Sequence, residues 1–214
     1  LAALALQFPH VEKLVVVEID AALVELARKW FPASAAAFDD PRTELVIADA
    51  LQWLHTAEGQ FDAVFIGLEY EPWRPASQTS RIPRTTAFVR GLRALLSPHG
   101  VVVQGIGSIA TLRHSKMMLE LHRAAFQAVW PMAFSSLDGL VDLGDELDGR
   151  LLRPPQLAVL SSASHLDPND VDWQLWQRVQ AEPLCYHASM HGSLFVLPAE
   201  LQEHLEAPPP GAAR

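Results

Sequence analysis

The sequence predicts an α/β protein with a doubly wound, mostly parallel sheet. Short apolar runs typical of buried strands alternate along the chain with segments whose apolar residues recur at helical spacing. The first clear run, residues 15–20, reads Val-Val-Val-Glu-Ile-Asp and turns directly into a helical pattern. Half of the 214 residues are apolar, which is enough to fill a sizeable core.

Local sequence signals, such as apolar spacing and Pro or Gly residues, indicate where each element begins and ends. The helix at residues 21–31 has its apolar residues at helical spacing and stops before Pro32. The helix at residues 85–96 is amphipathic, and Ser-Pro-His-Gly at residues 97–100 ends it and leads into a strand. In chain order, we expect helix 1–8, strand 13–20, helix 21–31, strand 44–49, helix 51–55, strand 61–66, helix 85–96, strand 101–104, helix 109–129, strand 157–161, helix 171–180 and strand 193–197.

The sequence also predicts the loops, the extent of the domain and its terminal tail. We expect loops at residues 33–42, 67–83 and 138–150, of which the last is rich in Gly and Asp. Without an internal repeat or a convincing linker, residues 1–206 read as one domain, and the Pro-rich residues 207–214 read as a disordered tail. Because the chain opens on a helix-like segment, we expect further sequence upstream of Leu1.

Composition limits the class of protein. The 25 acidic residues exceed the 16 basic ones and no long basic block occurs, which argues against nucleic acid and suits a cationic or neutral ligand. A single cysteine, Cys185, excludes an internal disulfide and is compatible with a reducing cytosol, so we expect a cytoplasmic protein. We find no signal peptide and no apolar run long enough to span a bilayer, so we expect no membrane contact.

Acidic residues stand at three successive strand ends. Glu18 and Asp20 are two apart, so on a strand they point to the same side, and an acid there can accept both hydroxyls of a nucleotide ribose. Asp20 can equally be only the N-cap of the next helix. Asp49 ends the second strand, and Glu69 and Glu71 lie in the loop after the third. Because ligands gather outside the carboxyl ends of such strands, the pattern indicates a nucleoside-like ligand beside a cationic group.

Several motifs together resemble the spermidine synthase (polyamine aminopropyltransferase) family. They are Val-Glu-Ile-Asp at residues 17–20, Phe-Asp-Asp-Pro-Arg at 38–42, Ala-Asp-Ala at 48–50, Phe-Asp-Ala-Val-Phe-Ile at 61–66 and Ser-Pro-His-Gly-Val-Val-Val-Gln at 97–104. The ending from Tyr186 to Pro198 is similar to that family's closing pattern. The resemblance implies the methyltransferase-like Rossmann fold, with its first strand missing from this chain.

The resemblance also implies roles for individual residues. Glu18, with Asp20 beside it, would hold the ribose of decarboxylated S-adenosylmethionine, and Asp49 with the backbone at Ala50 would face the adenine amino group. Gln104 and Tyr186 would line the polyamine side of the cleft. An ordinary strand-end amide is the alternative for Gln104, and a core aromatic residue is the alternative for Tyr186. The family further implies a polyamine-like small molecule as substrate, and we expect a homodimer as assembly.

The chain departs from the family where the chemistry is expected. Gly67 occupies the position of the family's first aspartate, which accepts the proton of the attacking amine. Glu71, directly before Pro72, stands for the second aspartate, and Glu69 would be the substitute proton acceptor. The Gly-rich turn of the family would lie upstream of Leu1 and is absent, as is the family's small N-terminal β-region.

Two other kinds of site are disfavoured. His114 and His122 lie on a predicted helix without an acidic partner at ligand spacing, and His187 and His191 lie where a loop enters a strand, so we expect no metal site. No Gly-x-Ser-x-Gly elbow for a serine nucleophile occurs.

Three hypotheses about function follow. The first is an aminopropyltransferase that uses decarboxylated S-adenosylmethionine as co-substrate. The second is a methyltransferase on the same fold that uses S-adenosylmethionine itself. The third is a catalytically altered family member that acts as a nucleoside-binding or assembly module, which the missing aspartate at Gly67 supports.

Overall fold

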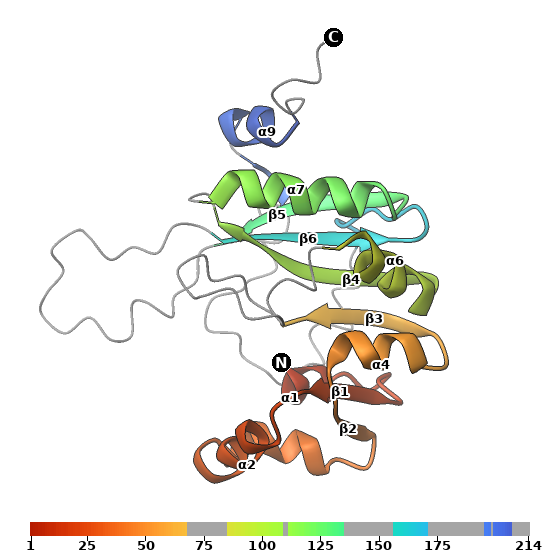
Figure 1. Cartoon of the computed structure of the whole chain (residues 1–214), viewed down its shortest axis with the longest axis vertical. Helices are drawn as coiled ribbons and strands as arrows, with labels where there is room; N and C mark the ends of the chain where they lie inside the picture. The colour runs from red at the N-terminus through yellow and green to blue at the C-terminus, as the bar shows by residue number, and fades with distance from the viewer. Residues whose placement is uncertain (68–84, 109–110, 135–155, 171–194, 198, 207–214) are drawn as a thin grey trace, which may run out of the picture. The chain divides into compact units, whose positions relative to one another are not determined.

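A computed structural model gives the structure of the chain, and it describes residues 1–67, 85–108, 111–134, 156–170, 195–197 and 199–206 (Figure 1). The described residues fall into two compact units, which we treat separately. Unit 1 contains residues 1–58, and unit 2 contains the described residues from 59 onward. The single-domain boundary at residue 206 and the disordered tail remain predictions.

Unit 1 is built on a pair of parallel strands, β1 (Leu14–Glu18) and β2 (Thr43–Ile47). They pair in register from Leu14 opposite Thr43 to Glu18 opposite Ile47. The predicted strands at residues 13–20 and 44–49 are therefore confirmed in position and are shorter at their ends. The helices of this unit are α1 (Ala2–Ala5), α2 (Ala21–Trp30), α3 (Pro32–Ala35), the 3-10 helix η1 (Ala36–Asp39) and α4 (Ala50–Thr56).

The expected loop at residues 33–42 is wrong over its first part, because α3 and η1 lie there. Pro32 stands at the first helical position, where its fixed φ is already helical and its missing N–H costs no hydrogen bond. The alanines that follow are strong helix formers. A proline that ends one helix therefore also starts the next.

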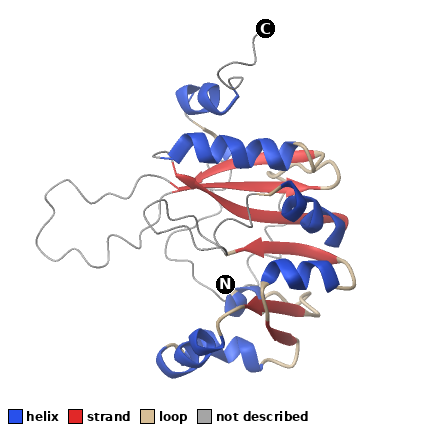
Figure 2. Cartoon of the chain, viewed as in Figure 1, coloured by secondary structure: helices blue, strands red, loops and turns tan. Residues whose placement is uncertain are grey.

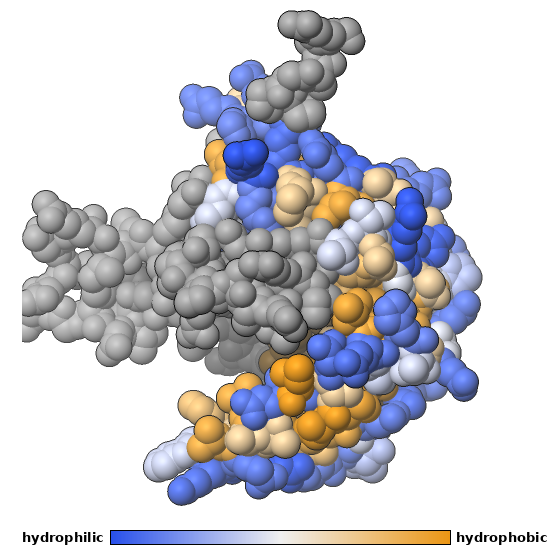
Figure 3. All heavy atoms as spheres, viewed as in Figure 1, coloured by the Kyte–Doolittle hydropathy of each residue, from blue (hydrophilic) through white to orange (hydrophobic). Residues whose placement is uncertain are grey.

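Helix α2 exposes most of the apolar residues that predicted it. Val24 is buried, whereas Leu23, Leu26 and Trp30 are each more than half exposed. Figure 3 shows hydrophobic surface, drawn orange, over the elements of unit 1. The spacing thus located the helix correctly without showing which residues pack.

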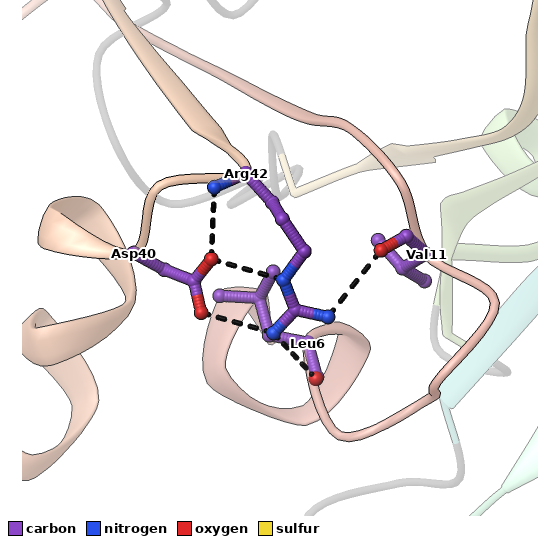
Figure 4. A network of polar contacts seen from close by, with 4 residues as sticks. All are labelled: Leu6, Val11, Asp40 and Arg42. Atoms are coloured by element: carbon purple, nitrogen blue, oxygen red, sulfur yellow. Dashed lines mark hydrogen bonds and ion pairs between the residues drawn. The ribbon is translucent and has the colours of Figure 1, made fainter.

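Arg42 joins three segments of unit 1 (Figure 4). Its guanidinium donates to both carboxylate oxygens of Asp40, at 3.0 and 2.9 Å, and to the backbone oxygens of Leu6 and Val11, at 3.0 and 3.3 Å. Its own backbone oxygen accepts from Leu14 N at 2.9 Å, at the start of β1. Hydrogen bonds from Arg42 lower the pKa of Asp40 below its ordinary value. Through its side chain and its backbone, this one residue therefore fixes how the chain enters both strands.

Unit 2 contains a four-stranded sheet in the order β3-β4-β6-β5 (Figure 2). Its strands are β3 (Phe61–Ile66), β4 (Leu96–Ser108), β5 (Ala128–Phe134) and β6 (Gln156–Ser162), and its helices are α6 (Thr86–Leu95), α7 (Leu112–Arg123) and α9 (Ala199–Glu206). β3 and β4 are parallel, while β6 is antiparallel to both β4 and β5. Three of these four strands thus point the same way, which confirms the predicted α/β class with a mostly parallel sheet.

The predicted helix at residues 109–129 is wrong beyond Arg123. Backbone N–H groups of Ala125 and Phe126 close the last turn on His122 O, and the chain then enters β5. β5 pairs only with β6 among the described strands, and such an edge position tolerates Pro131, which lacks an N–H. Pairing with β6 therefore determines the structure from Ala128 onward, although the apolar residues before it recur at helical spacing.

The expected strand at residues 193–197 is also not formed in its described part. Phe195 lies in a 3-10 turn, and the next two residues have no regular structure. Leu197 packs instead against the core cluster of Ile106, Met118 and Leu119, just before α9 begins at Ala199. The segment thus precedes helix α9, which the sequence pattern did not predict.

Replacing Asp40 tests the network around Arg42. Asp40→Asn should lower the free energy of unfolding at neutral pH, because it removes the carboxylate that holds the guanidinium. Since the pKa of Asp40 is lowered, its contribution is complete above the ordinary pKa of about 4 and is lost as the pH falls through the lowered value. Thermal unfolding should therefore separate the two proteins at about pH 7 and bring them together toward about pH 2.

Asp39→Asn is the matched control. Asp39 is a neighbouring carboxylate that makes an exposed ion pair with Arg28 at 2.8 Å, of a kind that contributes about 0–1 kcal/mol. An equal loss of stability in both variants would show that the Asp40–Arg42 network has no special part in the fold.

Candidate functional site

The carboxyl ends of β1 and β2 bring three of the predicted site residues to one edge of unit 1. Glu18 ends β1 opposite Ile47, and its backbone oxygen accepts from Ala48 N at 3.0 Å. Asp49 follows directly, and Asp20 lies two residues beyond Glu18. Parallel pairing in register therefore produces the acidic edge that the sequence predicted.

Glu18 is held in place by its own turn. Its Oε1 accepts from Asp20 N at 2.9 Å, and the residue is half-buried. Among the described residues, no hydrogen bond ends on the second oxygen, Oε2. The carboxylate is thus oriented through one oxygen and can accept a ligand hydroxyl through the other.

Asp20 and Asp49 both cap helices. Asp20 Oδ1 accepts from Ala22 N and Leu23 N at 2.9 and 3.3 Å, which confirms the capping interpretation for this residue. Asp49 Oδ1 accepts from Leu51 N at 2.7 Å and caps α4 in the same way. A ligand role for either carboxylate stays a prediction and would have to use the other oxygen.

Ala50 is the first residue of α4 and is half-buried. The backbone N–H groups of a first helical turn have no partner within their own helix. The position is therefore suited to a backbone donor, as the sequence-based prediction for Ala50 requires.

In unit 2, Gly67 and Gln104 lie on neighbouring strands. Gly67 directly follows β3, and Ile66, the last residue of that strand, pairs with Gln104 of β4. Gly67 is exposed, and a Cβ built there would meet no atom within 4 Å. No described atom therefore stands in the way of a Cβ at the position where the resemblance predicts an aspartate. Glu69, Glu71 and Tyr186 lie outside the described residues, so their roles remain predictions.

Gln104 belongs to a buried polar network that the sequence reading missed. Its Oε1 lies 3.0 Å from Nε2 of His122, whose Nδ1 lies 2.9 Å from Oγ of Ser161. All three residues are at most 1% exposed, and burial lowers the pKa of His122 to about 4. A signal was present in the sequence, because His122 lies four and three residues after the buried Met118 and Leu119 on the same helix face.

The described part of the chain holds neither a candidate metal centre nor a candidate membrane span. No group of three or more His, Cys, Asp or Glu residues there could hold a metal ion. No helix among the same residues is both long and apolar enough to cross a membrane.

Solved structures define the class of fold. A crystal structure of spermidine synthase in complex with the transition state analogue AdoDATO superposes with a TM-score of 0.76 at 20% identity, covering 94% of this chain and 63% of that one. The spermidine synthase of Thermotoga maritima gives 0.74 at 19% identity, covering 94% and 62%. Human methyltransferase-like protein 13 in complex with SAH gives 0.51 at 16% identity, covering 92% and 72%. The fold is thus methyltransferase-like, as the sequence resemblance implied.

The family follows from the sequence itself. Residues 4–135 match the spermine/spermidine synthase domain, so the chain belongs to this family. Putrescine N-methyltransferase 2 of Nicotiana tabacum is 26% identical over 207 residues, which cover 94% of this chain and 56% of that protein. The polyamine aminopropyltransferase of Nitrosomonas europaea is 28% identical over 204 residues, covering 95% and 59%. The chain therefore spans little more than half the length of these curated relatives.

Proposed function

We propose that this chain forms the nucleoside- and amine-binding part of an aminopropyltransferase, which moves the aminopropyl group of decarboxylated S-adenosylmethionine to a di- or polyamine. The observation that carries the proposal is the oriented carboxylate of Glu18 at the end of β1, in a chain of the spermine/spermidine synthase family. A carboxylate at this place in an open α/β sheet accepts the hydroxyls of a nucleoside ribose.

The nucleoside is held from the edge of unit 1. Glu18 accepts the ribose hydroxyls, Asp20 supports the same turn, and Asp49 with the backbone of Ala50 meets the adenine amino group. Two structural neighbours support an S-adenosylmethionine-related ligand, because their crystals contain AdoDATO and SAH. No step of the proposal uses a metal ion.

The reaction is a substitution at carbon. The lone pair of the acceptor amine forms a bond to the carbon beside the sulfonium, the C–S bond breaks with its electron pair on sulfur, and methylthioadenosine leaves uncharged. The amine must lose a proton, which Glu69 accepts, while Glu71 holds the cationic acceptor; Gln104 and Tyr186 line the same side. The excess of acidic residues favours a polyamine-like cation over nucleic acid.

Methyl transfer to putrescine is the second candidate. The specific observation in its favour is the match to putrescine N-methyltransferases of Nicotiana tabacum over 94% of this chain. In this case the methyl group of S-adenosylmethionine moves, and S-adenosylhomocysteine is released. We also propose a homodimer in the cytoplasm as the working form, which the family resemblance and the single cysteine support.

Product analysis tests the proposed function. The full-length protein is given putrescine with either S-adenosylmethionine or its decarboxylated form, and the products are identified by mass spectrometry. We expect spermidine and methylthioadenosine from the decarboxylated form. N-methylputrescine with S-adenosylhomocysteine would replace the proposal by its second candidate. Nucleoside binding without either product would favour the catalytically altered module.

Nucleoside binding is tested by substitutions that keep the local fold. Glu18→Gln still accepts from Asp20 N, and Asp49→Asn still caps α4, so each removes mainly a charge. We expect each to weaken methylthioadenosine binding by about 1.5–3 kcal/mol, roughly 10- to 150-fold in Kd by calorimetry. Undiminished binding in both variants would contradict the assignment. Asp20→Asn, which also keeps its cap, should have little effect if Asp20 serves only the helix.

The proton acceptor is tested in the loop after β3. Glu69→Gln should lower kcat by about a hundred- to ten-thousandfold and leave methylthioadenosine binding intact, because a general base is lost. Glu71→Gln, which keeps the shape of the second acid, should mainly raise KM for the amine. Equal rates in both variants and the wild type would remove the two glutamates from the mechanism. Gly67→Asp, whose Cβ would meet no described atom within 4 Å, should raise activity if only the position of the carboxylate was lost.

A further inference from the structure

His122 joins the C-terminal end of helix α7 to the strands of unit 2. Its ring nitrogen Nε2 lies 3.0 Å from Oε1 of Gln104 on β4, and Nδ1 lies 2.9 Å from Oγ of Ser161 on β6. Its backbone oxygen accepts from Ala125 N and Phe126 N at 3.0 and 2.9 Å, which closes the last turn of α7 before the chain enters β5. The ring also stacks on Phe126, with centroids 5.5 Å apart. One residue therefore fixes where α7 ends on the sheet.

The ring of His122 is uncharged in this arrangement. A carboxamide oxygen only accepts hydrogen bonds, so the proton lies on Nε2, which donates to Gln104, and Nδ1 accepts from the hydroxyl of Ser161. A second proton would occupy Nδ1 and turn the hydroxyl of Ser161 into an acceptor. Both hydrogen bonds then persist, but neither partner carries a negative charge. The cost of a second proton is therefore the burial of an unbalanced charge and not the loss of a hydrogen bond.

No described carboxylate balances a charge on this ring. His122 is the one buried titratable side chain among the described residues. Of the elements packed against α7, β5 and β6 carry no titratable group, β4 carries the exposed His99, and α6 carries Arg90 and Arg93. The groups on α9, all exposed, are Glu200, Glu203, His204 and Glu206. Those on α7 itself, exposed or half-buried, are Arg113, His114, Lys116, Glu120 and Arg123. Burial lowers the pKa of His122 to about 4, and none of these groups offsets it.

We propose that His122 is a pH-sensitive switch, which holds the end of α7 on β4 and β6 while its ring is uncharged and releases α7 when the ring takes up a second proton. The imidazolium gains its hydration only when the ring leaves the core, so proton uptake and release of the helix are coupled. The apolar cluster that includes Met118 and Leu119 of α7 then becomes accessible to water. The inference goes beyond the proposed function and does not depend on it, because it concerns how α7 packs and not what the protein binds.

The direction of the pH dependence follows from the lowered pKa of His122. The ordinary pKa of a histidine is about 6.5, which applies to the unfolded chain, whereas the pKa of His122 in the folded protein is about 4. Its contribution to stability is therefore complete above about pH 6.5 and is lost as the pH falls toward about 4. Within this window, each pH unit should raise the equilibrium constant for unfolding by up to about tenfold through His122 alone.

Urea unfolding of the full-length protein at about pH 6 and about pH 4.5 tests the switch. Other groups also titrate in this range, so the wild type is compared with His122→Gln, whose side chain forms hydrogen bonds but takes up no proton. The fall in pH should raise the unfolding constant of the wild type about 20-fold more than that of His122→Gln. His99→Gln is the matched control, because it removes an exposed histidine of the same unit, and it should keep the pH dependence of the wild type.

Hydrogen exchange locates the transition in the structure. After correction for the intrinsic effect of pH on exchange, the amides of α7 (Leu112–Arg123) should lose protection before those of β4 and β6 in the wild type, and not in His122→Gln. Equal pH dependence of unfolding in these two proteins would overturn the inference, as would protection of α7 that matches that of β4 down to about pH 4.5.

A titration of the His122 ring by NMR in the wild type covers the case in which His122→Gln does not fold. Proton uptake that coincides with the loss of protection in α7 supports the switch. A ring that takes up its second proton near its ordinary pKa of about 6.5, with α7 still protected, contradicts it.

Discussion

Parallel strand pairing in register is the constraint on which the candidate site depends. In unit 1 it sets Glu18 opposite Ile47 and therefore brings the residues after both strands, Asp20 and Asp49, to one edge. In unit 2 the same kind of pairing sets Ile66 opposite Gln104. Side chains far apart in sequence meet only because parallel strands end at the same edge. At the other end of the two strands, hydrogen bonds of Arg42 fix the chain where it enters β1 and β2. This network therefore stabilises the pairing from the amino ends of the strands.

Acidic residues at these strand ends can serve two purposes, to cap the next helix and to accept hydrogen bonds from a ligand. A helix that starts after a strand needs a capping acceptor, and a nucleoside at the same edge needs an acceptor for its hydroxyls. Asp20 and Asp49 meet the first demand with one carboxylate oxygen each. Glu18 does not cap a helix, and only one of its oxygens accepts a hydrogen bond within its own turn. It is therefore the acid best placed to accept the hydroxyls of a nucleoside. The structure thus ranks three carboxylates that the sequence could only group together.

The sequence predicted β1, β2, β3 and the helices after β1 and β2, because strands of a parallel sheet read as continuous apolar runs and their ends carry strong signals such as Asp20 and Pro32. It failed where tertiary contacts decide. The helical spacing through Val129 continued into β5, which exists because β6 pairs with it. The apolar spacing of α2 did not show that Val24, and not Leu23, packs inward. The spacing of His122 from Met118 and Leu119 signals its burial, but its hydrogen-bond partners could not be predicted, since they come from two strands distant in sequence.

Gly67 stands where the family resemblance predicts an aspartate, and the backbone at this position does not require a glycine. The glycine is exposed, its surroundings leave space for a side chain, and its backbone is not in the left-handed region that would demand glycine. Neither sterics nor strain therefore explains the absence of a carboxylate. On the neighbouring strand, Gln104 is fully buried and its Oε1 lies 3.0 Å from Nε2 of His122. The difference at Gly67 therefore lies in the side chain alone, since the strand before it and its parallel pairing with β4 are those of the expected sheet.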